Sequence, residues 1–205
     1  SSYFAGQIAS AVQEIARSMN GHGTLRIVSA GKNPVTEYIG KPEGAYDFSS
    51  SALKTPVSPV VQMDLAVRLS ANELINAEKK RAIILFTDGN VTNDAFGRYN
   101  LSELTAYLNN NSISFSVVQM AQTALCSEID YICKNTNGKE YYVFRNEGLS
   151  EIVQNLTDIP QGVYQFSYVS SMQTNFGEKF LPIEVEVYLL NKSGRVESGY
   201  FAPLQ

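Results

Sequence analysis

An apolar run that ends in a carboxylate and a glycine is the feature of this chain best suited to chemistry. Residues 81–87 read RAIILFT and are followed by Asp88 and Gly89. Such a run predicts a buried strand. In an open parallel sheet, ligands bind just beyond the carboxyl ends of the strands, which is where Asp88 is expected to lie. We take Asp88 as the leading candidate residue, and the structural alternative is an ordinary Asp-Gly turn.

Catalytic interpretations find little support elsewhere. His22 is the single histidine, and its neighbours Gly21 and Gly23 indicate the end of a helix. A Ser/His/Asp or Cys/His mechanism therefore has one base and no local nucleophile. The sequence contains no GxSxG elbow, no GxxxxGK phosphate loop and no Cys/His cluster for zinc. A phosphoacceptor aspartate would also explain Asp88, but it requires an acidic pair and a lysine that we do not find. We predict that the chain is not an enzyme.

Charge and composition exclude further classes of partner. The formal net charge is −4, and the 16 basic residues are scattered, so nucleic acid is not an expected partner. No apolar stretch reaches the ~18 residues of a membrane span. Cys126 and Cys133 would lie about 10.5 Å apart in one helix, so they can pair only if Cys126 precedes it.

The elements that position Asp88 alternate between strand and helix. The apolar spacing predicts a helix over 3–19, a strand over 25–30 and an antiparallel partner over 35–39. A polar loop should follow, and Ser58 with Pro59 should open the next helix. Beyond the Asp88 strand we expect a helix capped by Asn100 and Glu103, a strand over 113–120, a helix near 125–132, a strand over 140–144 and a helix over 149–156. This order predicts an α/β fold, a three-layer αβα Rossmann-like open sheet, in a domain of residues 1–160.

Residues 161–205 change to a period of two and predict a small antiparallel β appendage. We expect a hairpin turn at 191–194 and a short strand over 196–201. Glu184 and Glu186 alternate with apolar residues. They suit either a paired-carboxylate site or a solvated strand face, and the second interpretation is favoured.

The helix start at Ser2, the loop with Thr55 and the strand end at Asp88 together resemble a von Willebrand factor type A domain, from Ser2 to about Leu156. The resemblance implies the αβα sheet of that family and a metal-ion-dependent adhesion site for Mg²⁺ or Mn²⁺ at its carboxyl end. Asp88 matches the aspartate of the third loop. Thr55 matches the threonine of the second loop, and Ser2 matches the last serine of the Asp-x-Ser-x-Ser motif.

The first aspartate and the first serine of that motif have no counterpart in this sequence. A shell with a single carboxylate predicts weak metal binding, so we expect the metal to be absent from this form. The resemblance also implies that the first strand, in the middle of the sheet, is missing. We expect that the chain is a fragment, that a complementing segment or a second chain supplies the strand, or that a rearranged element fills the gap.

The function that the resemblance implies is a non-enzymatic protein-binding or adhesion module. Its protein ligand is expected to contact Thr55, Asp88 and Asn90, with an acidic side chain of the partner completing the metal shell. The alternative is a metal-free structural or assembly scaffold within a larger secreted or surface protein. The tail resembles a β extension found in some bacterial secreted proteins, which implies an extracellular, periplasmic or cell-surface location.

Overall fold

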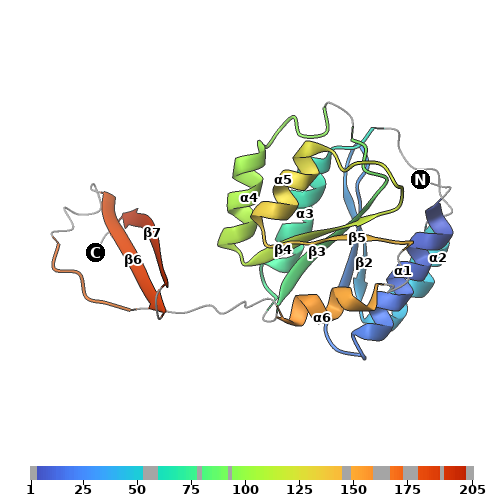
Figure 1. The fold of residues 1–205 in the computed structure, drawn as a ribbon, viewed down its shortest axis with the longest axis horizontal. Helices are drawn as coiled ribbons and strands as arrows, with labels where there is room; N and C mark the ends of the chain where they lie inside the picture. Colours follow the sequence, from blue (N-terminus) through green and yellow to red (C-terminus); the bar gives the residue numbers. More distant parts are fainter. Residues whose placement is uncertain are drawn as a thin grey trace. The chain divides into compact units, whose positions relative to one another are not determined.

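A computed structural model describes residues 4–52, 60–77, 80–91, 94–144, 149–158, 167–172, 180–189 and 192–201. The chain divides into two units, residues 1–161 and 162–205, and each is described by itself. Helices α1 to α6 and strands β1 to β5 lie in the first unit, and β6 and β7 lie in the second (Figure 1). Among the described residues, no helix is long and apolar enough to cross a membrane.

A parallel sheet forms the centre of the first unit. Its order is β3 (Arg81–Thr87), β4 (Ile113–Gln119) and β5 (Glu140–Tyr142). Side chains of β4 alternate between two cores: Phe115 and Val117 belong to one, and Val118 to the other. The first core is closed by α4 (Leu101–Asn110) and α5 (Ser127–Asn135), and the second by α1 (Ala5–Ser18) and α6 (Ser150–Asp158). The predicted three-layer αβα sheet is thus confirmed.

A second sheet in this unit is the antiparallel hairpin of β1 (Leu25–Ser29) and β2 (Val35–Gly40), which was expected. Among the described residues it makes no ladder with β3. Helix α3 (Met63–Leu74) joins the two sheets. Its Glu73 accepts a hydrogen bond from Thr36 Oγ1 at 3.0 Å and lies 3.8 Å from Arg26 Nε. Val67 and Ala71 of the same helix pack in the core to which β3 contributes.

Two expectations about helices were wrong. The stretch expected to be a polar loop contains α2 (Pro42–Ala52), which begins with a proline and a glutamate in its first turn. The buried residues of α2 include Ala45 and Ser49, and the partly buried Phe48 stacks on Tyr38 with 5.6 Å between ring centroids. Helix α3 begins at Met63 after Gln62, and not at Ser58. Residues 58 and 59 lie outside the described part of the chain.

The capping box predicted for α4 is present. The Asn100 side chain accepts the Glu103 backbone N–H at 2.8 Å, and the Glu103 carboxylate accepts the Asn100 N–H at 3.3 Å. Cys126 does precede α5, as a disulfide would require, but both cysteines are free thiols. Burial raises the pKa of the Cys133 thiol to about 11, with a further contribution from Glu140 and Asp130, which makes this thiol unreactive.

In the described part of the second unit, β6 (Phe180–Leu189) and β7 (Lys192–Phe201) form an antiparallel pair. The predictions of a turn at 191–194 and of a short last strand were wrong. Gly194 pairs with Val187 inside the ladder, so β7 begins earlier and has 10 residues. Glu184 lies 2.8 Å from Arg195 in an exposed ion pair, which fits the solvated strand face rather than a carboxylate site.

Candidate functional site at the carboxyl edge of the parallel sheet

Asp88 follows β3 directly, at the edge where Thr87 pairs with Gln119 of β4. Its side chain is half-buried. The carboxylate oxygen Oδ1 accepts the Asn90 backbone N–H at 3.1 Å, which closes an Asx-turn. Among the described residues, the second oxygen, Oδ2, has no hydrogen-bond partner, so one lone-pair face of the carboxylate is free to accept a donor from a ligand.

Two of the described loops meet at this carboxylate, and we call them the carboxyl rim: residues 88–91 after β3 and residues 121–126 after β4. The Thr123 hydroxyl donates to the Asp88 carbonyl. The Cys126 N–H donates to the Gly89 carbonyl at 3.1 Å. These bonds fix the loops to each other while the side chains of Asn90, Gln122 and Thr123 remain exposed. The carboxyl rim therefore presents one carboxylate among uncharged polar groups.

Gly89 makes this arrangement sterically feasible. Its φ of +94° lies in the region that favours glycine. A Cβ at this position would lie 3.0 Å from both the Ala124 carbonyl oxygen and Thr123 Oγ1. The Thr87 hydroxyl also accepts the Gly89 N–H at 3.1 Å. The Asp-Gly pair is thus required by the turn, and the same turn presents the carboxylate.

Of the predicted site residues, the structure brings Asp88 and Asn90 together. Ser2 and Thr55 lie outside the described residues. Among the residues that the structure describes, no group of three His, Cys, Asp or Glu side chains is arranged to hold a metal ion. The described donors at the carboxyl rim include one carboxylate, and this set alone does not fit a divalent cation, which takes six or more oxygen ligands.

A residue that sequence reasoning missed is Asp64, whose side chain is 1% exposed near the start of α3. Its Oδ2 accepts the backbone N–H groups of Arg98 and Tyr99 at 2.6 and 3.0 Å, and its Oδ1 accepts that of Leu65 at 2.7 Å. Asp64 therefore holds the loop that leads from the carboxyl rim to α4. Two of its partners, the N–H groups of Arg98 and Tyr99, lie 34 and 35 positions away in the sequence, so no side-chain pattern identifies it.

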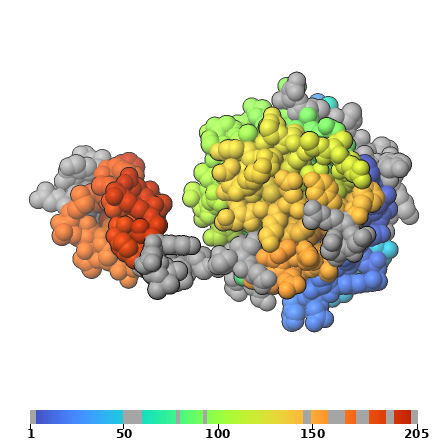
Figure 2. All heavy atoms as spheres, in the orientation of Figure 1, coloured from blue at the N-terminus to red at the C-terminus, as the bar shows by residue number. Residues whose placement is uncertain are grey.

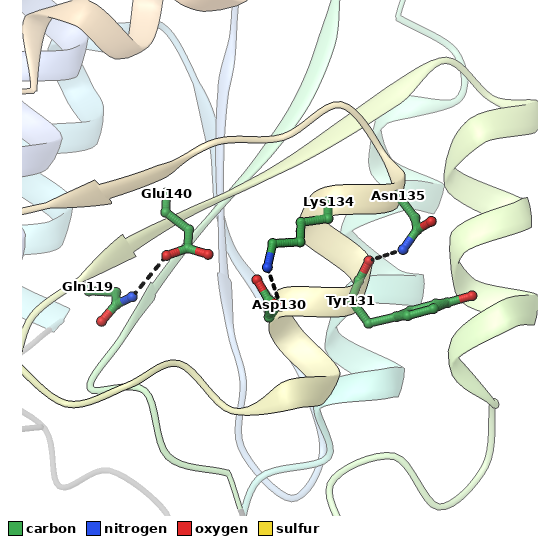
Figure 3. A network of polar contacts seen from close by, with 6 residues as sticks. All are labelled: Gln119, Asp130, Tyr131, Lys134, Asn135 and Glu140. Carbon is green, nitrogen blue, oxygen red and sulfur yellow. Dashed lines mark hydrogen bonds and ion pairs between the residues drawn. The ribbon is translucent and has the colours of Figure 1, made fainter.

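Polar contacts connect side chains at the end of β4 and the start of β5, and others lie along α5 (Figure 3). Gln119 Nε2 donates to Glu140 Oε2 at 3.3 Å, and Lys134 Nζ donates to Asp130 Oδ2 at 2.7 Å. Burial, and then the Asp130 carboxyl group, raise the pKa of Glu140. The bond from Lys134 lowers the pKa of Asp130. The pKa values of the two acids are thus shifted in opposite directions, down for Asp130 and up for Glu140.

His22 is remote from this edge. The residues Gly6, Gln7 and Ser10 of α1 line a shallow cleft with Val143 and Phe144, which follow β5. Helix α1 has 14 residues and is about 20 Å long, so the turn at His22 lies beyond the far end of the helix from Gly6. His22 lies exposed in the turn that ends this helix, where Asn20, Gly21 and Gly23 have positive φ. The expected helix stop is confirmed, and His22 has no place in the candidate site.

Comparison with solved structures identifies similar folds. An aerotolerance-related membrane protein from Bacteroides fragilis matches with a TM-score of 0.58 and 15% identity, over 76% of this chain and 89% of that one. The SpRpn10 VWA domain matches with a TM-score of 0.55 and 15% identity, over 78% and 87%. A von Willebrand factor type A protein from Catenulispora acidiphila matches with a TM-score of 0.58 and 10% identity, over 96% of this chain and 50% of that one. No protein-family model and no curated protein matches the sequence.

Proposed function

We propose, from the premise that this chain has the fold of a von Willebrand factor type A domain, that it is a non-enzymatic protein-binding module whose partner contacts the carboxyl rim. The observation that carries the proposal is the Asp88 carboxylate. One of its oxygens is fixed by the Asn90 N–H, and the other has no partner among the described residues. A pre-oriented acceptor of this kind loses little conformational entropy when a ligand binds.

The surface around Asp88 supports a polar contact with a protein. Asn90, Gln122 and Thr123 are exposed and carry amide or hydroxyl groups, and the main-chain bonds between the two loops hold these residues in place. Side chains on rigid loops give precise, specific contacts. A free carboxylate pairs best with a lysine or arginine of the partner through charge-assisted hydrogen bonds.

If binding depends on a metal ion, the side chain expected of the partner changes from basic to acidic. If Ser2 and Thr55 join Asp88 around Mg²⁺ or Mn²⁺, the partner would supply an acidic side chain in place of a basic one. The described residues provide only Asp88 for such a shell. Dependence on metal is therefore a separate arm of the test.

The second candidate function is a metal-free scaffold within a larger secreted or surface assembly. The second unit favours it, because Val187 and Val196 are 57% and 61% exposed on a pair of strands that has no further neighbour among the described residues. Two-stranded hairpins are marginally stable alone, so β6 and β7 are expected to pack against other β structure. The extracellular, periplasmic or cell-surface location rests on the resemblance of this tail alone.

Affinity capture with matched variants tests the proposed function. The chain is immobilised and exposed to an extract of its source cells, and bound proteins are identified by mass spectrometry. Asp88→Asn removes the negative charge but keeps the oxygen that accepts the Asn90 N–H, so the turn should persist. Asp94→Asn removes an exposed carboxylate that lies outside the carboxyl rim.

We expect one captured protein to be retained by Asp94→Asn and lost with Asp88→Asn. Loss in chelator as well would indicate the metal-bridged form, and retention in chelator would indicate direct contact with a basic group. A partner that binds all three forms equally, with or without chelator, would favour the scaffold and contradict a binding site at Asp88.

A further inference from the structure

An arginine on α3 lies against two tyrosine rings. Arg68 belongs to α3, Tyr107 belongs to α4, and Tyr99 lies in the loop that leads into α4. The Arg68 Cζ atom is 3.4 Å from the centroid of the Tyr107 ring and 5.4 Å from that of the Tyr99 ring. Both distances are within the range of a cation–π contact. Helices α3 and α4 contact each other and contribute side chains to the same core (Figure 1).

Other residues of α3 hold the two tyrosines in place. The Tyr107 hydroxyl donates to Asn72 Oδ1 at 2.6 Å, and Asn72 lies four residues after Arg68. The Tyr99 N–H donates to Asp64 Oδ2 at 3.0 Å, and Asp64 lies four residues before Arg68. Both rings also pack against the first core. Since residues four apart share one face of a helix, the guanidinium lies in the middle of a row of α3 residues that fixes its surroundings.

The N–H groups of Arg68 are free to bind a ligand. Among the described residues, the guanidinium donates no hydrogen bond and takes part in no ion pair. Its nitrogens are not among the buried atoms that lack a partner, so they are exposed to solvent. A guanidinium carries its five donors in one plane, and stacking covers only its face. The donors at its edge therefore stay available.

The acidic residues of the same helices have other partners. The Asp64 carboxylate accepts three main-chain N–H groups. Glu73 lies 3.8 Å from Arg26 Nε. Glu103 accepts the Asn100 N–H at 3.3 Å in the cap of α4. The positive charge on α3 is therefore not neutralised by an ion pair within the described part of the chain.

Arg98 adds a second positive charge next to Tyr99. Its main-chain N–H donates to Asp64 at 2.6 Å, which fixes this part of the loop against α3. The Arg98 side chain is exposed and has no ion pair among the described residues. The whole chain has a formal net charge of −4, so an anion does not bind to it through net charge. Binding of an anion here would depend on the local arrangement of the two arginines.

We propose that Arg68, oriented by Tyr99 and Tyr107, is a binding site for a carboxylate of an acidic protein segment, and that Arg98 supplies a second positive charge to it. The planar edge of a guanidinium matches a carboxylate with two parallel hydrogen bonds. Because stacking already restricts the Arg68 side chain, little conformational entropy is lost when the ligand binds.

A phosphate group is the other oxyanion that suits arginine, and the structure favours the carboxylate. Phosphate sites commonly use the free main-chain N–H groups at the N-terminus of a helix. At the start of α4, which lies next to Tyr99, the capping box of Asn100 and Glu103 already occupies these groups. The Glu103 carboxylate would also repel a doubly charged phosphate more strongly than a single carboxylate.

This site shares no residue with the carboxyl rim, and it takes a partner group of the opposite charge to the one that the Asp88 carboxylate takes. Its failure or success is therefore independent of the proposed function. A partner that carries both acidic and basic groups could contact both sites, but neither site requires the other.

Titration with an acidic peptide tests the site. The probe is a peptide of six glutamates with blocked ends, and a peptide of six glutamines is the control. The chemical shifts of the Arg68 Nε–H group and of the Tyr99 and Tyr107 rings report binding. We expect saturable shifts with the glutamate peptide alone, and an affinity that falls as salt is added.

Matched variants separate this site from a general effect of charge. Arg68→Gln should weaken binding by about fivefold or more, measured at the Tyr99 ring. Arg17→Gln removes an exposed arginine of α1 that has no ion pair among the described residues, and it should change the affinity by less than about twofold. Unchanged amide shifts of β4 confirm the fold of each variant.

Two further variants test the orientation of the guanidinium. Arg68→Lys keeps the charge but loses the planar pair of donors, so its affinity should lie between those of the unaltered chain and Arg68→Gln. Tyr107→Leu removes the stacking surface without changing any charge, and it should also weaken binding. Unchanged affinity in Tyr107→Leu would contradict a role of the ring in orienting Arg68.

Two other results would overturn the proposed site. Equal affinities of Arg68→Gln and Arg17→Gln would show that the peptide responds to net charge and not to Arg68. If inorganic phosphate shifts the same signals at lower concentration than the glutamate peptide, the site binds phosphate groups and the assignment to a carboxylate is wrong.

Discussion

Asp64 and Arg98 are joined by a 2.6 Å hydrogen bond from the Arg98 backbone N–H to the Asp64 carboxylate, although they lie 34 positions apart. The carboxylate is 1% exposed and also accepts the Tyr99 and Leu65 N–H groups. The carboxylate thus accepts, in place of water, hydrogen bonds from main-chain N–H groups of a loop that has no regular secondary structure. The Asp64 carboxylate therefore anchors residues 98 and 99 of the loop between the carboxyl rim and α4.

The first prediction is that Asp64→Ala lowers the free energy of unfolding by about 3 kcal/mol, because buried N–H groups lose a charged acceptor. Urea denaturation measures the change. Asp94→Ala removes an exposed carboxylate of the same loop and should change stability by less than about 0.5 kcal/mol. Equal effects of the two substitutions would show that Asp64 does not hold the loop.

The second prediction concerns Gly89→Ala. The added Cβ would meet the Ala124 carbonyl at a φ of +94°, so we expect a loss of about 1–3 kcal/mol and a displaced carboxyl rim. Thermal melts and backbone chemical shifts of residues 121–126 report both effects. Gly97→Ala is the control, since its Cβ would meet only the Asp94 carbonyl at 3.4 Å. Unchanged shifts in Gly89→Ala would contradict the tight turn.

The third prediction is a pH dependence at Glu140. Its pKa is raised in the folded state by burial and by Asp130, so its contribution to stability is full below the unfolded pKa and is lost as pH rises through the folded pKa. Glu140→Gln should therefore raise stability at neutral pH by less than ~1 kcal/mol, and the gain should vanish in acid. Chemical denaturation at several pH values measures it.

Glu128→Gln is the control for this pH series. Backbone N–H groups at the start of α5 lower the pKa of Glu128, and Ser127 adds to the effect. The stability that ionised Glu128 contributes is present above its unfolded pKa and is lost as pH falls through its folded pKa. Glu128→Gln should therefore lower stability at neutral pH, whereas Glu140→Gln should raise it. Two substitutions that change stability in the same direction at neutral pH would contradict the assignment of the shifts.

The fourth prediction is that divalent metal leaves the stability of this chain nearly unchanged. A complete site at about 100 times its dissociation constant would add about 2.7 kcal/mol, which is several degrees in a melt. The described carboxyl rim supplies only the Asp88 carboxylate, so melts in Mg²⁺, Mn²⁺ and chelator should coincide. A stabilisation by metal that Asp88→Ala abolishes would show instead that further ligands complete the shell.

Local patterns were sufficient to predict most of the fold. The apolar runs of β3 and β4 and the reciprocal cap of Asn100 and Glu103 are encoded within a few residues, and they lie where the sequence placed them. Helix α2 was missed because its serine-rich sequence has weak helix propensity, and contacts such as the stacking of Phe48 on Tyr38 support it instead.

The candidate site could be predicted only in part. The strand end and the Asp-Gly pair locate Asp88, since both are local features. The partners that define its surroundings are distant in sequence: the Thr123 hydroxyl bonds to the Asp88 carbonyl across 35 positions, and Asp64 binds main-chain groups that carry no side-chain signal. The roles expected of Ser2 and Thr55 remain predictions, because both lie outside the described residues.

The most direct test of the central claim, that a protein partner binds at the carboxyl rim, is site-specific photo-crosslinking. A photoreactive amino acid replaces either Asn90, exposed beside Asp88, or His22, exposed in the turn that ends α1. Figure 2 shows one face of the molecule, on which yellow residues of α5 and orange residues of α6 are exposed. We predict a crosslinked partner from position 90 that Asp88→Asn abolishes, and none from position 22. Equal crosslinking from both positions, or no effect of Asp88→Asn, would contradict the claim.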